Sequence, residues 1–260
     1  MSADRTREPG LGAGTRSWEL GAAAPPTLTG MATPAFSIVI PVHNEADYMP
    51  GALAELFAEL STVPASIDVL IVENGSTDGS AAVARALIPD HPGLSVISLP
   101  TPDYGAAMRD GFEATDGDWA VNFDIDYFSG AFLNVVLDLG DGADIVLASK
   151  RAPGADDRRS MFRRFATWTF NKLLRYGLGS GVSDTHGMKA IRRQVIADIA
   201  PQCRSTQDLF DTELVVRAER AGYRIVEVPA IVEEKRETKS SLVARVPRTL
   251  RGMIAIRRSL

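Results

Sequence analysis

Residues 121–128 have the sequence VNFDIDYF, an apolar run that ends in two carboxylates one residue apart. Side chains alternate along a β-strand, so residues i and i+2 lie on the same side of it. We therefore expect Asp124 and Asp126 to face one point just beyond a strand end. Two carboxylates there suit Mg²⁺ or Mn²⁺, which are usually held by one or two carboxylates together with substrate phosphates. The alternative is a loop that caps the following helix.

Upstream of this stretch, short apolar runs alternate with segments of helical periodicity. Strands are predicted at 36–41, 67–72, 94–99 and 119–123, and helices at 47–60, 80–87 and 104–115. This alternation indicates βαβ units with right-handed crossovers and a mainly parallel sheet. Ligands of such sheets bind beyond the carboxyl ends of the strands, so the loops after the first, second and fourth strands should converge on one site.

Downstream, the pattern predicts further helices and strands. Helices are expected at 128–139, 161–176, 193–199, 209–220 and 242–258, and strands at 144–148, 187–191 and 224–232. Pro247 predicts a kink or a late start in the last helix, because proline disrupts a helix interior.

The composition bounds the class of protein. The 260 residues suffice for one α/β domain with appendages, and 45% of them are apolar. A net charge of −5 gives no sign of nucleic-acid binding. The one cysteine, Cys203, excludes an internal disulfide and fits a reducing compartment. No apolar run approaches the ~20 residues of a membrane span, and no signal peptide is visible, so we expect a cytoplasmic location.

Three parts of the chain differ in composition. Residues 1–34 are rich in Gly, Ala, Pro and Thr without periodicity, which predicts a disordered extension. Met31 immediately precedes the first strand and is a candidate for the natural start. Residues 35–241 form the predicted main domain, and residues 242–260 a basic amphipathic C-terminal helix.

Acidic residues follow the first two strands. Glu45 ends the loop PVHNE (41–45), and Glu73 begins the loop ENGSTDGS (73–80). A carboxylate at each strand end can accept hydrogen bonds from a base or ribose, and the N–H groups at the next helix start can bind a phosphate. The alternatives are structural: Glu45 as a charge near a helix N-terminus, and Thr77 or Asp78 as a helix cap, a role that we favour for Thr77.

These motifs carry a resemblance. Residues 37–45, SIVIPVHNE, resemble the opening of family-2 glycosyltransferases with the GT-A fold, and residues 69–80 resemble their second motif. That motif usually begins with two aspartates, where this chain has Glu73-Asn74. Gly105, Ala106 and Gly111, followed by GDW (117–119) and DID (124–126), complete the nucleotide-binding half.

The resemblance implies a fold and a donor site. The fold would be α/β of the GT-A type, with a mainly parallel, Rossmann-like sheet flanked by helices and a helical C-terminal segment on the acceptor side. The residues expected to bind the nucleotide-sugar donor are Pro41, Glu45, Glu73, Gly75 and Asp124.

The second half of the chain resembles the polyprenyl-phosphate (dolichyl-phosphate) sugar synthases. VSDTHGMK (182–189) is similar to their Asp-Thr-Gln-Cys-Gly-Phe-Lys pattern but one residue shorter, and residues 210–229 also match. KRETKSS (235–241) resembles their Arg-x-x-Gly-Ser-Lys element without its glycine. In the family this segment closes over the donor diphosphate or the acceptor phosphate, which implies Arg236 and Lys239 as phosphate ligands.

The implied activity is metal-dependent, inverting transfer of a hexose from a UDP- or GDP-sugar to a polyprenyl phosphate or related lipid. Departure of the nucleoside diphosphate needs charge neutralisation, which Mg²⁺ or Mn²⁺ would supply. Asp126 lies further beyond the strand end and is expected to bind the metal directly. Asp124 is expected to face the ribose or to reach the metal through water.

The acceptor decides whether a catalytic base is needed. Asp211 matches the position where many family members keep their base; alternatively it belongs to the N-cap region of helix 209–220. A hydroxyl acceptor must lose a proton, whereas a lipid phosphate is already anionic and needs cations to place it. Lys150 and Arg151 match the family's basic residue after the fifth strand, which implies phosphate or acceptor contact, with a solvated edge as the alternative. His186 is a candidate for contact with the metal or a phosphate, with hydrogen bonding within its loop as the alternative.

The last twenty residues contain five arginines and no acid, interleaved with apolar residues. A basic amphipathic helix can lie on an anionic bilayer, and helix 161–176 is a second such element. The alternative is a helix packed on the domain with an arginine-rich outer face. A homodimer is left open.

Two rival functions remain at this stage. The first is a glycosyltransferase that acts on a soluble or glycolipid hydroxyl. The second, from another class, is a non-catalytic protein that binds nucleotide sugars or serves as a scaffold.

Overall fold

The computed structural model describes residues 35–157, 161–206, 209–232 and 242–260. The predicted disordered extension, the Met31 start and the proposed phosphate ligands Arg236 and Lys239 lie outside the described residues.

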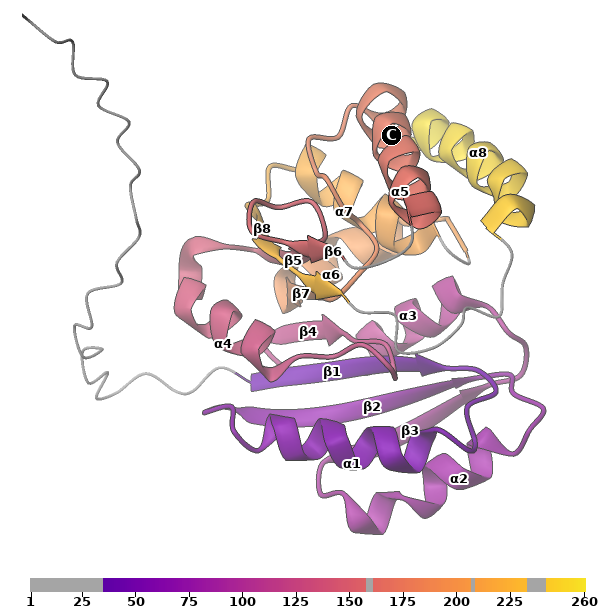
Figure 1. Cartoon of the computed structure of the whole chain (residues 1–260), viewed down its shortest axis with the longest axis vertical. Coiled ribbons are helices and arrows are strands. Elements are labelled where there is room, and N and C mark those ends of the chain that lie inside the picture. The colour runs from indigo at the N-terminus through magenta and orange to yellow at the C-terminus, as the bar shows by residue number, and fades with distance from the viewer. Residues whose placement is uncertain (1–34, 158–160, 207–208, 233–241) are drawn as a thin grey trace, which may run out of the picture. The chain divides into compact units, whose positions relative to one another are not determined.

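A seven-stranded sheet organises the described chain (Figure 1). Its strand order is β3-β2-β1-β4-β7-β5-β8, and only β7 runs antiparallel to its neighbours. The strands are β1 (Ala35–Val42), β2 (Ser66–Asn74), β3 (Leu94–Leu99), β4 (Trp119–Asn122), β5 (Ile145–Ser149), β7 (Lys189–Arg192) and β8 (Ile225–Pro229), with a separate pair formed by β6 (Asp156–Asp157) and β9 (Ile231–Val232). The predicted mainly parallel sheet is confirmed.

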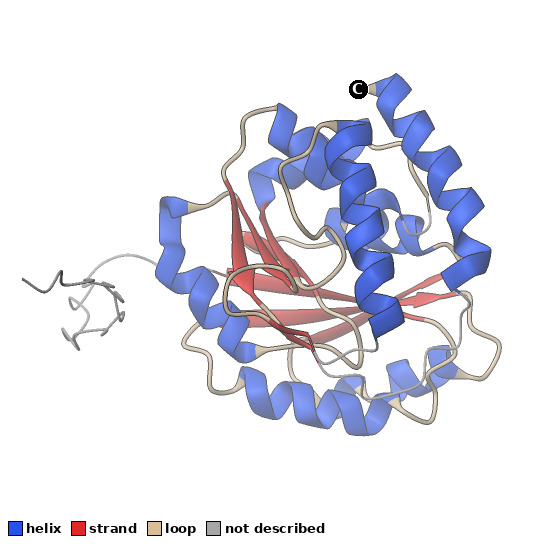
Figure 2. Ribbon diagram, turned by 45° about the horizontal axis from the view of Figure 1, so that its top comes forward, coloured by secondary structure: helices blue, strands red, loops and turns tan. Residues whose placement is uncertain are grey.

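Helices cover both faces of the sheet (Figure 2). The α-helices are α1 (Met49–Leu60), α2 (Ser80–Ala86), α3 (Tyr104–Glu113), α4 (Gly130–Leu139), α5 (Met161–Leu173), α6 (Arg193–Ile199), α7 (Phe210–Arg220) and α8 (Leu242–Ser259). Short helical turns are η1 (Ile88–Asp90), η2 (Gly140–Gly142), η3 (Leu174–Leu178) and η4 (Ala200–Gln202).

The alternation of side chains in β1 separates two cores. Ile38 and Ile40 pack with residues of α1, α2 and α4 on one face of the sheet. Val39 packs with α3, α6 and α7 on the other face. Because both faces are covered, the buried middle parts of β1 and β2 are continuous apolar runs, as is usual for buried parallel strands. A third cluster joins η3, α7 and α8, and it contains Met253 and Ile256.

Three elements differ from the prediction. The helix predicted at 161–176 is α5 followed by η3, a π-helical turn. The strand predicted at 224–232 is divided at Pro229, after which the Ala230 N–H donates to the Ser149 carbonyl and the chain pairs with β6. Pro247 lies inside α8, so the late start predicted as one of two outcomes does not occur.

Among the described helices, none is long and apolar enough to cross a membrane.

Candidate active site

The loops after β1 and β2 are held together by hydrogen bonds. Asn44, whose φ of 56° is the left-handed conformation, accepts from the Thr77 N–H through its Oδ1 (2.8 Å) and donates its own N–H to Ser76 Oγ (3.0 Å). The Glu45 N–H donates to Ser80 Oγ (2.9 Å), four residues further along the second loop. The carboxyl ends of these two parallel strands therefore present one rigid surface.

The start of α2 is capped differently from the prediction. Thr77 makes no cap; its N–H is bound by Asn44, and the N-cap residue is Gly79. Asp78 accepts from the N–H and the hydroxyl of Ser80 and from the Ala46 N–H, and these bonds, that of the Ser80 hydroxyl first, lower its pKa to about 2. The Asp78 carboxylate thus binds the Ser80 N–H, one of the N–H groups at the start of α2 that were predicted to bind a phosphate.

Glu73, which was predicted to bind the donor, is buried, and its Oε1 accepts from the Ser76 N–H (2.5 Å). One of its oxygens is therefore already used to shape the loop. Gly75 has a φ of 64°, and a Cβ there would lie 2.7 Å from the backbone at Pro102. Only glycine fits this close approach.

The two carboxylates after β4 lie in a turn. The Asp124 N–H donates to the Tyr127 carbonyl (3.1 Å) and the Tyr127 N–H to the Asp124 carbonyl (3.0 Å), so the strand has already ended at Asn122. Asp124 and Asp126 therefore do not follow the alternation of a strand, as was predicted, because the chain reverses here. Buried Ile125 lies between the two aspartates and anchors the turn in the core.

The electrostatic surroundings of Asp124 favour a cation. Its side chain keeps contact with solvent, but the protein packed around it removes enough water to raise its pKa to about 6. The carboxylates of Asp126 and Asp211 also raise this pKa. The ammonium groups of Lys189 and Lys150 oppose them.

The carboxylates of Asp124 and Asp126 suit a divalent metal ion whose other ligands come from a substrate. Within the described residues, no three His, Cys, Asp or Glu side chains gather into a complete metal site. Two hard carboxylates, with the remaining ligands supplied by phosphates and water, are the usual protein contribution for Mg²⁺. The donor set present is therefore suited to a metal–diphosphate complex.

A buried lysine connects β4 with α7. Lys189 in β7 is 1% exposed, and its Nζ donates to Asn122 Oδ1 (2.7 Å) and to Asp211 Oδ2 (2.9 Å). The Tyr104 hydroxyl donates to the same Oδ2 (2.9 Å). Within the described part of the chain, Asp211 Oδ1 is buried without a hydrogen-bond partner. Asp211 therefore lies in the first turn of α7, as the alternative prediction had it, but as one member of a buried ion pair.

A second polar cluster holds the loop before β7. The Lys150 Nζ donates to the His186 carbonyl (2.8 Å) and lies 3.5 Å from Asp184 Oδ2. The other Asp184 oxygen accepts from the His186 N–H (3.0 Å). Lys150 was predicted as a phosphate ligand, and in the structure its ammonium is bound to groups of the protein. The Arg151 side chain is exposed.

His186 lies beside both clusters. Its ring packs edge-on against Phe170, with 4.9 Å between the centroids. Burial lowers the pKa of His186, while the charges of Asp184 and Asp211 oppose this. A neutral imidazole at this place can donate or accept one hydrogen bond, but it is not a standing positive charge.

The structure brings most predicted site residues to one edge of the sheet. Adjacent strand ends carry Pro41, Glu45, Glu73, Gly75, Asp124 and Asp126. The charges that act on Asp124 and His186 include Asp211, Lys150 and Lys189, which places these groups close by. This arrangement agrees with the rule that ligands of parallel sheets bind beyond the carboxyl ends of the strands.

Comparison with known proteins decides the family. Residues 37–200 match the model described as Glycosyl transferase family 2. The chain belongs to glycosyl transferase family 2. The predicted family and the assignment as a glycosyltransferase are thereby confirmed.

Relatives in this family include lipid-phosphate enzymes. An uncharacterized glycosyltransferase of Mycobacterium tuberculosis is 31% identical over 226 residues, which cover 86% of this chain and 95% of the relative. Polyprenol monophosphomannose synthase of Mycolicibacterium smegmatis is 30% identical over 213 residues, or 76% of this chain and 77% of that protein. Undecaprenyl-phosphate 4-deoxy-4-formamido-L-arabinose transferase of Klebsiella pneumoniae is 26% identical over 76% of this chain and 60% of that protein. The resemblance to the polyprenyl-phosphate branch is confirmed.

Solved structures establish the fold. Mannosyl-3-phosphoglycerate synthase from Rubrobacter xylanophilus has a TM-score of 0.66 at 22% identity, covering 86% of this chain and 74% of that chain. Glucosyl-3-phosphoglycerate synthase from Mycobacterium tuberculosis in complex with UDP has a TM-score of 0.64 at 20% identity, covering 86% and 80%. The predicted GT-A fold is confirmed.

Sequence reasoning missed several residues of this glycosyltransferase site. Tyr104 and Asn122 were not singled out, and Asp184 and Lys189 were quoted only as part of the motif 182–189, although all four belong to the polar clusters. For Lys189 a signal was present: it stands in the apolar run Met188–Ile191. Lysine is almost never fully buried unless it is paired, so a lysine in a core strand predicts a buried carboxylate partner.

Proposed function

We propose that this protein is a metal-dependent, inverting glycosyltransferase that moves a hexose from a UDP- or GDP-sugar to a polyprenyl phosphate or related lipid acceptor. Two relatives are named as polyprenyl-phosphate enzymes, which supports this acceptor class. Crystal structures of the similarly folded glucosyl-3-phosphoglycerate synthase contain Mn²⁺ with UDP-glucose and phosphoglyceric acid, which supports a nucleotide-sugar donor and a divalent metal.

The burial and ion pairing of Asp211 are the main support for a phosphate acceptor. This carboxylate is 2% exposed, and its Oδ2 is bound by the Lys189 ammonium and the Tyr104 hydroxyl. A general base must be within hydrogen-bond reach of the proton that it removes. A carboxylate held in a buried ion pair is poorly placed for that task, and a phosphate acceptor makes no such demand. Asp211 then serves to position Lys189 beneath the Asp124 turn.

The residues would divide the work as follows. Pro41, Glu45, Glu73 and Gly75 shape the surface for the nucleoside, with Asp124 toward the ribose or a metal-bound water. Asp124 and Asp126 would hold Mg²⁺ or Mn²⁺, which, when bound, would neutralise the departing diphosphate. The exposed Arg151, together with Arg236 and Lys239, remains proposed for phosphate contact, and His186 for a single hydrogen bond.

One observation favours the rival with a hydroxyl acceptor. Asp211 Oδ1 is buried and, among the described residues, without a partner. A buried carboxylate oxygen normally has a hydrogen-bond donor, and an acceptor hydroxyl could supply one if the surrounding segments moved.

Transfer assays with Asp211→Asn separate the two acceptors. The purified protein, Mn²⁺ and UDP- or GDP-hexoses are incubated with a short-chain isoprenyl phosphate or with the corresponding isoprenol. We expect transfer to the phosphate and a loss of less than about 10-fold in the variant, because loss of a true general base costs ~10²–10⁴-fold. Asp138→Asn, at an exposed aspartate of α4, is the matched control.

Near-complete loss in a folded Asp211→Asn protein, together with transfer to the isoprenol, would support the hydroxyl rival. Failure of every nucleotide hexose to undergo transfer or hydrolysis would instead support the non-catalytic rival.

A further inference from the structure

Two helical segments of the described chain combine several basic residues with no acidic one. They are α5 with η3 (Met161–Leu173 and Leu174–Leu178) and α8 (Leu242–Ser259). Together they carry nine arginines or lysines. Because the whole chain has a net charge of −5, the remaining residues carry −14. Positive charge is therefore concentrated in these two segments.

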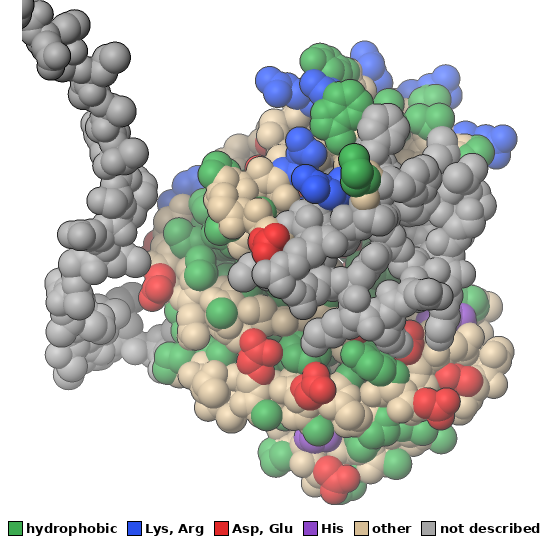
Figure 3. Space-filling model, in the orientation of Figure 1, with side chains coloured by type: hydrophobic (Ala, Val, Ile, Leu, Met, Phe, Trp, Pro, Cys, Tyr) green, Lys and Arg blue, Asp and Glu red, His purple; other side chains and the backbone are tan. Residues whose placement is uncertain are grey.

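The same segments carry exposed apolar side chains. Of the seven large hydrophobic residues exposed in the described chain, five lie here, and the other two, Ile88 and Val135, lie in η1 and α4. The exposed fractions of the five are 84% for Met161, 73% for Tyr176, 53% for Ile254, 44% for Trp168 and 40% for Leu250. Figure 3 shows apolar and basic side chains side by side over α5 and α8.

The exposed residues of α5 and η3 form one stripe. Trp168, Lys172 and Tyr176 follow each other at intervals of four, which places them on one helical face, and Met161 lies seven residues before Trp168. The Lys172 ammonium lies 5.6 Å from the Trp168 ring centroid and 5.5 Å from that of Tyr176. Tryptophan, tyrosine and lysine combine an apolar body with a polar end, so they suit the boundary between lipid and water.

In the part of α8 whose side chains the structure describes, one apolar face packs on the protein. Met253 and Ile256 are buried against Leu174, Leu178 and Leu209. Gly252 permits this contact, since a Cβ there would lie 2.1 Å from Leu209 Cδ1. The opposite face, with Leu250 and Ile254, is fixed in position by that packing and has solvent around it.

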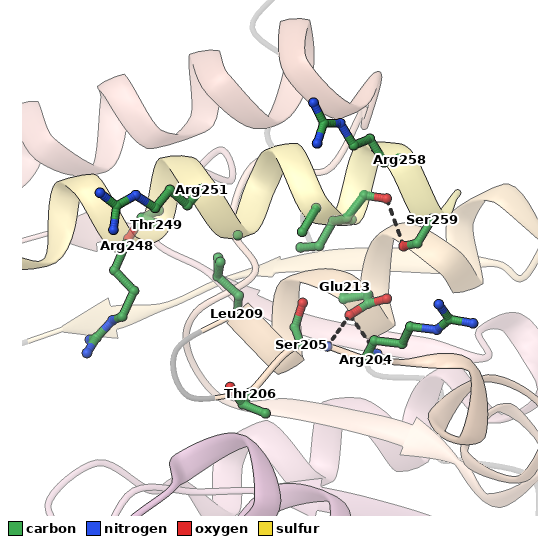
Figure 4. A pocket seen from close by; sticks show the side chains of 13 residues that line it. Arg204, Ser205, Thr206, Leu209, Glu213, Arg248, Thr249, Arg251, Arg258 and Ser259 are labelled. Atoms are coloured by element: carbon green, nitrogen blue, oxygen red, sulfur yellow. Dashed lines mark hydrogen bonds between the residues drawn. The ribbon is translucent and has the colours of Figure 1, made fainter.

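A cavity of about 720 Å³ lies below α8, lined by residues 204–206 and 209 and by α8 itself. Its one acidic side chain among the lining residues, Glu213, is bound by Arg217 and by the N–H groups of Arg204 and Ser205. Figure 4 shows the four lining arginines pointing in different directions, so they do not converge on one anion. They are Arg204, Arg248, Arg251 and Arg258. Their charges therefore add to the positive surface.

We propose that the face formed by α5, η3 and α8, the α5–α8 face, docks on an anionic lipid bilayer. Acid-free basic helices with exposed aromatic and aliphatic residues are suited to the headgroup region of such a membrane. A second copy of the chain is a poorer partner, because a two-fold contact would press this face against itself and bring like charges together. The acidic remainder of the molecule would be repelled by the bilayer and would orient the protein. The purpose, access to a lipid acceptor, rests on the proposed function.

Vesicle co-sedimentation tests the docking directly. The full chain is mixed with vesicles of phosphatidylcholine, with and without phosphatidylglycerol, and without any polyprenyl phosphate. We expect binding to the anionic vesicles, at least ~10-fold weaker at high salt because ionic screening shortens the range of the attraction. We also expect a blue shift in the emission of Trp168.

Paired variants identify the face. Trp168→Ser/Tyr176→Ser and Arg251→Gln/Arg258→Gln should each weaken vesicle binding at least ~10-fold, since they remove interfacial anchors or charges. Ile88→Ser/Val135→Ser and Arg85→Gln, at exposed positions elsewhere, are the matched controls and should bind like the unaltered protein. Equal binding by all variants, absence of binding to anionic vesicles, or a dimer that the same variants abolish would overturn the proposal.

A second assay keeps this proposal separate from the proposed function. The Trp168→Ser/Tyr176→Ser protein should transfer sugar normally to a water-soluble, short-chain isoprenyl phosphate. Vesicle binding without any sugar transfer would contradict the proposed function and leave membrane docking intact. Sugar transfer without vesicle binding would contradict membrane docking and leave the proposed function intact.

Discussion

Lys189 is the residue on which the polar interior of the site depends. Its ammonium is bound by Asn122 of β4 and by Asp211 of α7, so it joins the strand that precedes the Asp124 turn to a helix on the face of the sheet that α3 and α6 share. A buried ion pair of this kind is costly to break, because one partner is then left charged and without compensation. Lys189 is therefore expected to hold β4 and α7 in place and to contribute to the stability of the fold.

Lys189→Met should lower the free energy of unfolding by about 3–5 kcal/mol, the usual cost of leaving a buried charge unpaired. Urea unfolding measures this difference. Lys172→Met removes an exposed lysine and is the matched control, with an expected change within about 0.5 kcal/mol.

The double variant Lys189→Met/Asp211→Asn should recover much of that loss, because no buried charge remains. Additive losses in the double variant would show that the two residues are not coupled in this way.

The lowered pKa of His186 leads us to expect that the stability of the protein depends on pH. Its pKa is lowered from 6.5 by burial, so below that pH the unfolded chain binds more protons than the folded one. The free energy of unfolding should then fall as the pH drops from about 7.5 through 6.5, and His186→Asn should flatten this slope. Thermal unfolding across this range measures it.

The comparison with the variant is needed because Asp124, whose pKa is raised to about 6, gives a slope of the opposite sign at lower pH. Parallel curves for the unaltered protein and His186→Asn would contradict a lowered pKa for this half-buried imidazole.

At the scale of elements, α3 approaches the sheet more closely than a side chain permits. Gly111 faces β1 and β2, and a Cβ there would lie 2.4 Å from Val39 Cγ1 and 3.0 Å from Val72 Cγ2. Valine has little rotational freedom to yield, since its side chain is branched at Cβ. The usual gain from replacing a helical glycine by alanine, up to about 1 kcal/mol, should therefore be reversed.

Gly111→Ala should destabilise the protein by about 1–3 kcal/mol, the range for overpacking a core. Gly51→Ala in α1 is the matched control, because a Cβ there meets nothing within 4 Å, and it should stabilise instead. Denaturant unfolding of both variants measures the difference. Equal effects would mean that α3 can shift away from the sheet without cost.

The elements that local patterns define were predicted well. The apolar runs at 36–41 and 67–72 and the stripe in helix 47–60 sufficed for β1, β2 and α1, because continuous or periodic burial is written into neighbouring residues. The Asp124 turn was not predicted, because a chain reversal flanked by buried residues looks like the end of a strand when only a few neighbouring residues are considered.

The capping of α2 and the Lys189 ion pair escaped prediction for a different reason. The bonds from Asn44 to Thr77, from Ala46 to Asp78 and from Lys189 to Asp211 join residues 33, 32 and 22 positions apart. No local pattern specifies such partners. The family resemblance located the motifs that contain them, but only the fold shows which side chain satisfies which.

At the scale of the whole molecule, the concentrated positive charge and the candidate donor site lie in different regions of the chain. The acidic strand ends at Glu45, Glu73, Asp124 and Asp126 belong to the first half of the chain, and the acid-free helices to the second. Such a molecule can gather a metal and an anionic donor at one place while its basic face meets an anionic surface. Binding of the nucleotide at the acidic strand ends can therefore be measured without any acceptor.

Nucleotide binding should stabilise the whole fold in a metal-dependent way. A ligand that binds only the folded state at 100 times its Kd adds about 2.7 kcal/mol, and for a chain of this size each kcal/mol raises Tm by roughly 2–4 °C. We expect UDP or GDP with Mn²⁺ to raise Tm by roughly 5–10 °C at that concentration, and ADP to have little effect, which thermal-shift measurements would show. Asp126→Asn should remove the part that depends on Mn²⁺, whereas Asp90→Asn, at an exposed turn, should keep it. A shift that is equal with and without Mn²⁺, or that survives Asp126→Asn, would contradict metal binding at the Asp124 turn and leave the diphosphate to the basic side chains alone.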